Sequence, residues 1–298
     1  MNMKPLVLSV LLAPGLALAG TPINETREVD ATARIDVSNV KGAVNVSAWD
    51  KNEVAISGTL GDGAKRLAID GGRGSLSIRV EGPDKSRGWG SDTSMQETVL
   101  DLKVPRAAAL EIGVVSAEVA VNDTSGGNVQ VDSVSGRIRL ASVQSPRLRL
   151  ESVSGDIDFQ GRSDDASIET VSGDMIVRGV GGRTRAETVS GSMRINAASP
   201  FKQFDASSVS GDMEITGALA SGGRVEIETM SGDVRLNLPA AVSAKITAES
   251  FSGTLRSDFG TVRKPDRGPG TSLDASAGSG DGEISVDSFS GDVTIRKE

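Results

Sequence analysis

One eight-residue pattern recurs through the second half of this chain and limits the folds that the chain can adopt. It reads "SVSGDIDF" at 152–159, "TVSGDMIV" at 170–177, "SVSGDMEI" at 208–215, "TMSGDVRL" at 229–236 and "SFSGDVTI" at 288–295. A catalytic or phosphate-binding loop is needed once, whereas a structural repeat recurs because each copy packs on its neighbours. The pattern therefore predicts a repeat architecture.

The apolar residue before each Ser-Gly pair serves as a reference, called position 0. It falls at Val134, Val153, Val171, Val189, Val209, Met230, Phe251 and Phe289, and degenerate copies add Val115 and Val40. From Val115 to Phe251 the intervals are 18 to 21 residues, and the last interval is 38 residues. Residues 257–281, which are rich in Gly, Pro and Ser, lie in this long interval and predict a loop insertion.

Apolar residues alternate on both sides of each motif. Around Val153, positions −5 and −3 are Leu148 and Leu150, and positions +4 and +6 are Ile157 and Phe159. This period of two predicts two short strands in each repeat. The parity changes between positions −3 and 0, so a bend is expected there.

Two folds accommodate two strands per repeat. In a hairpin meander, Ser-Gly would be the turn, position −1 would be buried and position 0 would be exposed. In a parallel β-solenoid the chain turns a corner and continues, so that positions 0, +4 and +6 all point inward. Position −1 is Ser or Thr in all eight Ser-Gly copies and position 0 is always apolar, which favours the solenoid.

We therefore predict an all-β fold, a parallel β-solenoid (a single-stranded β-helix) that is right-handed, with about 19 residues per turn. Gly at position +2 would form the corner, and Ser at +1 would hydrogen-bond along the stack. The repeats occupy residues 111–298, and residues 20–110 are predicted to be an N-terminal β-region that caps the solenoid.

Residues 1–19 have the pattern of a secretory signal peptide. A basic Lys4 precedes an apolar run that ends in Ala17-x-Ala19. The run is too short to span a bilayer and no second one follows, so no transmembrane segment is predicted. We expect an exported protein, located in the periplasm or at the cell surface.

The composition excludes several classes of function. The chain contains no Cys, His or Tyr, which removes His-based triads and the commonest zinc sites. Its formal net charge of −8 argues against binding to nucleic acid. We expect no enzymatic activity and no cofactor.

The segment "VLDLKVPRAAALEIGVVSAEVAV" at 99–121 is a hydrophobic strand that ends in Val-Pro before the first repeat. Together with the repeated Ser/Thr-Val-Ser-Gly-Asp motif, it resembles a bacterial β-strand-repeat family of unknown function whose members are provisionally named adhesins, related to head-GIN-type β-helix domains. The resemblance implies an exported, β-helix-like protein with a role in adhesion, and it implies no catalytic residues.

Position +3 holds a column of carboxylates. Its members are Asp156, Asp174, Asp212, Asp233 and Asp292. Stacked Gly-x-Asp units can bind calcium, but calcium-binding rolls use a nine-residue repeat with Gly-Gly before the Asp. We expect no metal, with the aspartates capping corner amides or facing water. If a metal binds, Asp156, Asp174, Asp212 and Asp233 are the candidate ligands.

Position −2 forms a second acidic column. Its members are Asp132, Glu151, Glu169, Glu187, Glu228, Glu249 and Asp287, and the arginines expected to compensate them are Arg139, Arg194, Arg235 and Arg256 at +5. The column is either a solvated mixed-charge face or a stripe that binds a partner, with Glu151, Glu169 and Glu187 as candidates.

Trp89, between glycines in "SRGWGSD", either contacts a sugar or a partner or folds back onto the cap.

These features predict an exported, non-enzymatic β-solenoid that presents an extended binding surface, as an adhesin or envelope scaffold. The partner would be an unknown protein or glycan of the cell envelope. One alternative is a polysaccharide-active enzyme on a β-helix, although short loops between turns leave few walls for a cleft. Another is an accessory protein in envelope-stress sensing.

Overall fold

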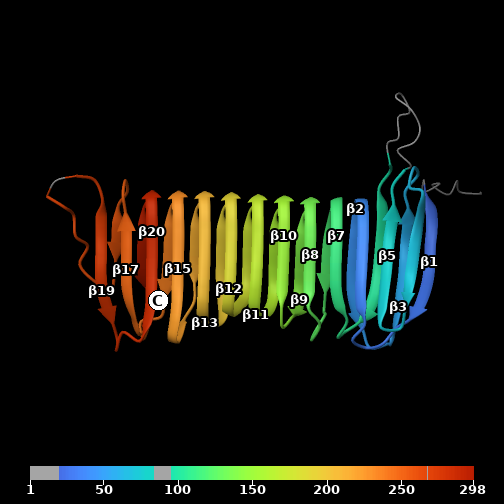
Figure 1. Ribbon diagram of the computed structural model, residues 1–298, viewed down its shortest axis with the longest axis horizontal. Coiled ribbons are helices and arrows are strands. Elements are labelled where there is room, and N and C mark those ends of the chain that lie inside the picture. The colour runs from blue at the N-terminus through green and yellow to red at the C-terminus, as the bar shows by residue number, and fades with distance from the viewer. Residues whose placement is uncertain (1–19, 84–94, 267) are drawn as a thin grey trace, which may run out of the picture.

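The computed structural model describes residues 20–83, 95–266 and 268–298, and this part of the chain forms strands, turns and loops. Figure 1 shows a long stack of strands that runs from β1 at one end to β19 at the other. The C-terminus lies inside the stack and not at its tip.

The strands have the following bounds. The N-terminal part contains β1 (Thr21–Glu28), β2 (Arg34–Trp49), β3 (Glu53–Leu60), β4 (Arg66–Gly72), β5 (Ser75–Glu81) and β6 (Thr98–Pro105). The central part contains β7 (Ala109–Asn122), β8 (Val129–Ser135), β9 (Ile138–Gln144), β10 (Leu148–Ser154), β11 (Ile157–Ser172), β12 (Met175–Ser190) and β13 (Met193–Ser210). The C-terminal part contains β14 (Met213–Thr216), β15 (Leu219–Ser231), β16 (Val234–Leu238), β17 (Ala244–Ser250), β18 (Leu255–Ser257), β19 (Thr271–Ala277), β20 (Gly282–Ser290) and β21 (Val293–Lys297).

Successive repeats stack as parallel strands. β10 lies between β8 and β11, and Ser152 pairs with Ser133 on one side and with Thr170 on the other. In the described repeats, the two strands of one repeat pair with neighbouring repeats and not with each other. The fold is therefore all-β and β-solenoid-like, and the hairpin meander does not occur in the repeats.

The last repeat of the sequence is not the last layer of the stack. β20 is parallel to both β15 and β17, so that Asp287 lies between Glu228 and Glu249. β21 is likewise parallel to β16 and β18. The chain thus passes beyond one layer and returns to fill it, which accounts for the long interval between Phe251 and Phe289.

Antiparallel strands lie at both ends of the stack. β19 pairs antiparallel with β17, so the predicted loop insertion contains a capping strand as well as a loop. At the other end, β3 is antiparallel to β1 and β6, and β4 is antiparallel to β5. The degenerate copy at Val40 is in register with the repeats, because β2 runs parallel to β7. Such terminal strands cover edges that would otherwise pair with other chains.

The corners require glycine at position +2, because the backbones of stacked corners lie too close together to leave room for a side chain. Gly191 has a φ of 142°, and a Cβ on it would lie 2.0 Å from the carbonyl oxygen of Gly173. The backbone N–H of Gly173 donates to the carbonyl of Ser190 at 3.1 Å. A side chain there would break both the backbone conformation and the spacing of the layers.

Candidate binding surface

The residues at position 0 point outward, and the expectation that they face the core is wrong. In the eight Ser-Gly copies and at Val115 the exposed fractions run from 46% for Val189 to 60% for Met230, whereas Val40 is partly buried against the core. Positions +4 and +6 do face inward, as Ile157 and Phe159 illustrate with 1% and 0% exposure.

The physical reason is that the strand alternation continues unbroken through position 0. In β10, Leu148, Leu150 and Ser152 are buried, and Val153 between Ser152 and the corner is exposed. The chain bends later, at the Gly-Asp pair, and burial resumes at Ile157. The parity change therefore falls after position 0, because Ser154 at +1 is exposed as well, and not between −3 and 0.

The hydroxyl at position −1 is buried beneath the corner. Ser208 and Ser250 place Oγ 3.4 Å and 3.1 Å from the carbonyl oxygens of Gly211 and Gly291. Within the described residues, the hydroxyls of Ser133, Ser152, Thr170, Thr188 and Thr229 are buried without a hydrogen-bond partner. Val114 occupies the same place in the first copy, so the site also accepts an apolar side chain.

The outward residues form one row, which we call the apolar ladder. In stack order it consists of Val115, Val134, Val153, Val171, Val189, Val209, Met230, Phe289 and Phe251. The rings of Phe251 and Phe289 are stacked, with centroids 5.1 Å apart and planes 10° apart. Exposed apolar rows of this length mark interaction sites in folded proteins.

The carboxylates at position −2 lie on the same outer face, and we call them the acidic ladder: Asp132, Glu151, Glu169, Glu187, Glu228, Asp287 and Glu249. Glu151 and Glu187 form ion pairs with Arg149 and Arg185 of their own strands.

The expectation that the arginines at +5 compensate the acidic ladder is wrong. Arg139, Arg194 and Arg256 lie beyond the corner, where they pair with Asp158, Glu214 and Asp292 at 4.0, 2.9 and 3.7 Å. Arg235 forms no ion pair within the described residues. A side chain two positions away in a strand shares its face, whereas one across the corner does not.

Negative charge is least compensated at the C-terminal end of the acidic ladder. Asp132 accepts a hydrogen bond from Gln130 at 2.9 Å, and Glu169 accepts one from Ser167 at 3.2 Å. Among the described residues, Glu228 and Glu249 have no side-chain partner, and Asp287 accepts only from Ser285 at 3.1 Å. Three adjacent strands therefore carry uncompensated carboxylates.

The aspartates at position +3 cap the corners. Asp156 and Asp174 accept the backbone N–H groups of Asp174 and Ser192 at 3.2 and 2.8 Å, and Asp212 and Asp233 do the same for Asp233 and Asp292 at 2.9 and 3.0 Å. The N–H of Asp174, and next the Arg137 guanidinium at 2.9 Å, hold the pKa of Asp156 below its ordinary value. In the described ranges no group of three or more acidic, His or Cys residues is placed to hold a metal.

Two further predictions concern residues outside the repeats. Trp89 and the signal peptide at 1–19 lie outside the described residues. Trp49, at the end of β2, donates from Nε1 to the carbonyl of Glu53 at 2.8 Å. In the part of the chain that is described, no helix is long and apolar enough to cross a membrane.

Two grooves run along the apolar ladder. One of about 680 Å³ lies over the valines and is bordered by Glu151, Glu169 and Glu187, the three predicted partner residues. The other, about 1000 Å³, lies between the C-terminal end of the ladder and the loop that precedes β19.

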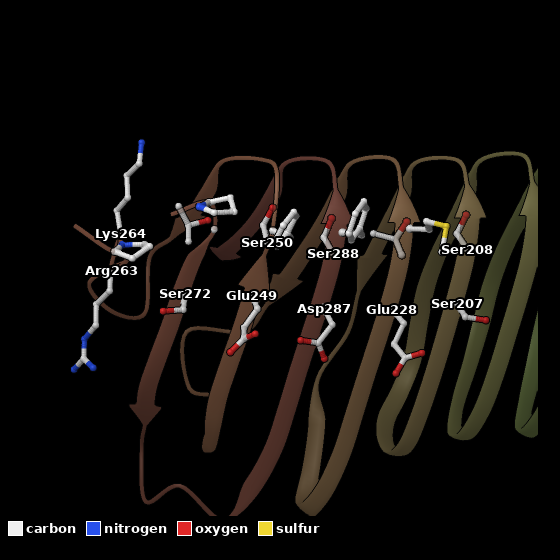
Figure 2. A pocket seen from close by; sticks show the side chains of 18 of the residues that line it. Ser207, Ser208, Glu228, Glu249, Ser250, Arg263, Lys264, Ser272, Asp287 and Ser288 are labelled. Carbon is white, nitrogen blue, oxygen red and sulfur yellow. The ribbon is translucent and has the colours of Figure 1, made fainter. Parts of the chain in front are cut away.

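Figure 2 shows Glu228, Asp287 and Glu249 in a row along the second groove, and Arg263 and Lys264 line the groove at its outer end. Neither of these basic side chains forms an ion pair within the described residues. The sequence interpretation missed the apolar members of this groove, Met230, Phe251 and Phe289. The signal that identifies them is the unbroken period of two from position −5 to position 0.

The parallel stack with its outward apolar and acidic ladders defines a β-solenoid-like repeat protein. The chain belongs to the Toastrack DUF4097 family, whose pattern matches residues 24–296. No curated protein matches it.

Three solved structures are similar to this chain. A provisionally named adhesin from Bacteroides fragilis is 12% identical, with a TM-score of 0.48 over 93% of this chain and 97% of that one. A provisionally named lipid-binding protein from Parabacteroides distasonis is 14% identical, with a TM-score of 0.44 over 94% and 99%. A provisionally named adhesin from the same organism is 12% identical, with a TM-score of 0.39 over 92% and 97%. At these values the names carry no information about what this chain binds.

Proposed function

We propose that this protein is an exported, non-enzymatic β-solenoid that presents the apolar ladder to a protein or glycan partner in the cell envelope, as an adhesin or an envelope scaffold. Export depends on the signal-peptide pattern at 1–19. A right-handed coil with about 19 residues per turn is part of the proposal.

The apolar ladder is the observation that supports this function. Nine apolar side chains, each about half exposed, follow one another on one face of the described stack. They add little to the packing of the monomer, while an uncovered apolar row invites aggregation. Contact with a partner along this row accounts for their presence.

The ionisable groups support the non-enzymatic part of the proposal. Polysaccharide cleavage uses a carboxylic acid with a raised pKa that donates a proton. Within the described residues, Glu81 and Asp156 are the acids whose pKa is shifted. Both pKa values are lowered, because Arg66 and the N–H of Asp174 stabilise the charged forms.

Site-specific photo-crosslinking tests the surface. A photoreactive phenylalanine analogue at Val171, on the apolar ladder, is expected to give a discrete crosslinked product in cells. The matched control is Ile176, an apolar and partly exposed residue beyond the corner. The same products from both positions, or none from Val171, would refute the proposed surface.

Two measurements test the remaining parts. The N-terminus of the purified mature protein is expected at Gly20, and a retained N-terminal segment would contradict export through this signal. Depolymerisation of an acidic polysaccharide by the purified protein would contradict the non-enzymatic part.

A further inference from the structure

The C-terminal end of the apolar ladder differs from the rest in both shape and charge. β15, β20 and β17 lie side by side and carry Met230, Phe289 and Phe251 at position 0. The same three strands carry Glu228, Asp287 and Glu249 at position −2, as Figure 2 shows. Large apolar side chains thus replace the valines on three adjacent strands whose acidic-ladder carboxylates form no ion pair within the described residues.

The chemistry of this end calls for a ligand that is both apolar and cationic. The stacked rings of Phe251 and Phe289 form part of the floor of the groove of about 1000 Å³. Aromatic faces attract cations, and neighbouring carboxylates strengthen that attraction. A neutral or anionic ligand would leave Glu228 and Glu249 without a counter-charge.

The spacing of the ladder indicates the ligand's conformation. Adjacent strands lie about 4.8 Å apart, so the apolar side chains repeat at that distance along the stack. An α-helix with an apolar residue every three to four positions repeats at about 5.3 Å along its axis. An extended chain repeats on one face at about 6.8 Å. Across three strands the helix deviates by about 1 Å and the extended chain by about 4 Å.

We propose that the groove lined by Met230, Phe289 and Phe251 binds a cationic amphipathic α-helix of a partner protein. The helix lies along the stack, with its apolar stripe on these three side chains and its Lys and Arg residues against Glu228, Asp287 and Glu249. This inference rests on the proposed function, since it names the partner class for one end of the same surface.

A second copy of this chain and an anionic membrane are less suited to the groove than a cationic helix. A second copy of this chain has a net charge of −8 and offers no helix within its described residues. An anionic membrane is repelled by the acidic ladder.

Binding of a synthetic helix to the purified mature protein tests the proposal. The probe is a fluorescein-labelled peptide of about 18 residues, with Leu along one stripe and Lys on its flanks. Fluorescence anisotropy is expected to give a dissociation constant in the micromolar range, with binding that weakens as salt is added.

Two double variants separate the apolar and ionic contributions. Glu228→Gln with Glu249→Gln is expected to weaken binding about tenfold and to reduce its salt dependence. Phe251→Ser with Phe289→Ser is expected to weaken it about tenfold or more. The matched control, Ile176→Ser with Glu118→Gln, makes the same kinds of change beyond the corner, away from both ladders, and should leave binding unchanged. The melting temperature of each variant is measured alongside.

Several outcomes would overturn the inference. Equal binding by the double variants would place the helix elsewhere, and equal binding of a proline-interrupted peptide of the same composition would exclude a helical ligand. A dimer that Phe251→Ser with Phe289→Ser dissociates would identify the occupant as a second copy. Binding to neutral phospholipid vesicles without binding to the peptide would identify a lipid.

The two proposals can fail separately. If the peptide does not bind while Val171 still gives its specific crosslink, the inference is wrong and the proposed function stands. If the peptide binds while Val171 gives no crosslink, the groove binds a helix but the extended surface is not the functional one.

Discussion

Two methionines in consecutive repeats test the outward orientation of position 0. Met213, at position +4, is 1% exposed, and Met230, at position 0, is 60% exposed. Truncation of each to alanine removes the same three heavy atoms, so any difference in stability reflects the two environments. Met213→Ala is expected to destabilise the protein strongly, and Met230→Ala hardly at all.

The magnitude follows from burial. Removal of three buried side-chain atoms at Met213 loses about 2 kcal/mol of transfer free energy, and the cavity left behind raises the cost to about 2–4 kcal/mol. In a chain of this length each kcal/mol shifts the melting temperature by about 2–4 °C, so a decrease of about 5–15 °C is expected. Met230 is largely exposed in both states, so its truncation should change stability by about 0.5 kcal/mol or less.

The assay is thermal and urea unfolding of the two variants and the parent, followed by circular dichroism. Stacked repeats can unfold in parts, so the slopes of the urea curves are compared before free energies are derived. An equal or larger loss for Met230→Ala would mean that position 0 packs into the core. It would refute the apolar ladder and every inference drawn from it.

Four further predictions concern the corners. Gly191→Ala should destabilise the protein by about 2–4 kcal/mol in thermal unfolding, because Gly191 combines a positive φ with a close backbone contact. Gly113 has open space around it, so Gly113→Ala should change the stability by about 1 kcal/mol or less. Thr170→Val should stabilise the protein by up to about 1 kcal/mol, since the buried hydroxyl has no partner and Val114 fills the equivalent site; a loss of stability would contradict this. Because folding lowers the pKa of Asp156, its carboxylate stabilises the fold above the unfolded pKa of about 3.9, and this contribution disappears as pH falls through the folded pKa. Asp156→Asn should therefore lower the melting temperature slightly at pH 7, and this difference should shrink as the pH falls below about 3.9; a difference that does not change with pH would refute the charge effect. Millimolar calcium should leave the melting temperature unchanged, and a marked rise would reverse the assignment of the aspartates as corner caps.

Several features of the fold could be predicted from the sequence. The repeated Gly at position +2 predicted the corner, and the alternation around Ile157 and Phe159 predicted their burial. The aspartates were expected either to cap corner amides or to face water, and Asp156 and Asp174 accept backbone N–H groups at the corners. These predictions succeed because strand period and glycine conformation are local properties of the chain.

The candidate surface was predicted less well than the strands and corners. The reason is that a shift of one residue in the position of the bend moves every neighbouring side chain to the opposite face. The sequence placed Val153 inside because it is apolar and Ser152 outside because it is polar, and the structure has the opposite arrangement. A buried hydroxyl beneath the corner is tolerated because it is small and, in some repeats, lies near a glycine carbonyl.

The sequence is sufficient to predict a stack of similar β-layers, since the strand period recurs along the repeats and the corner glycine is present in all eight Ser-Gly copies. Only the tertiary structure decided which apolar residues are left outside and which layers are neighbours. Glu228, Asp287 and Glu249 belong to adjacent strands although Glu249 precedes Asp287 in the chain. Parallel strand pairing satisfies the backbone hydrogen bonds in any order of the layers, so the order along the chain does not specify the order in space.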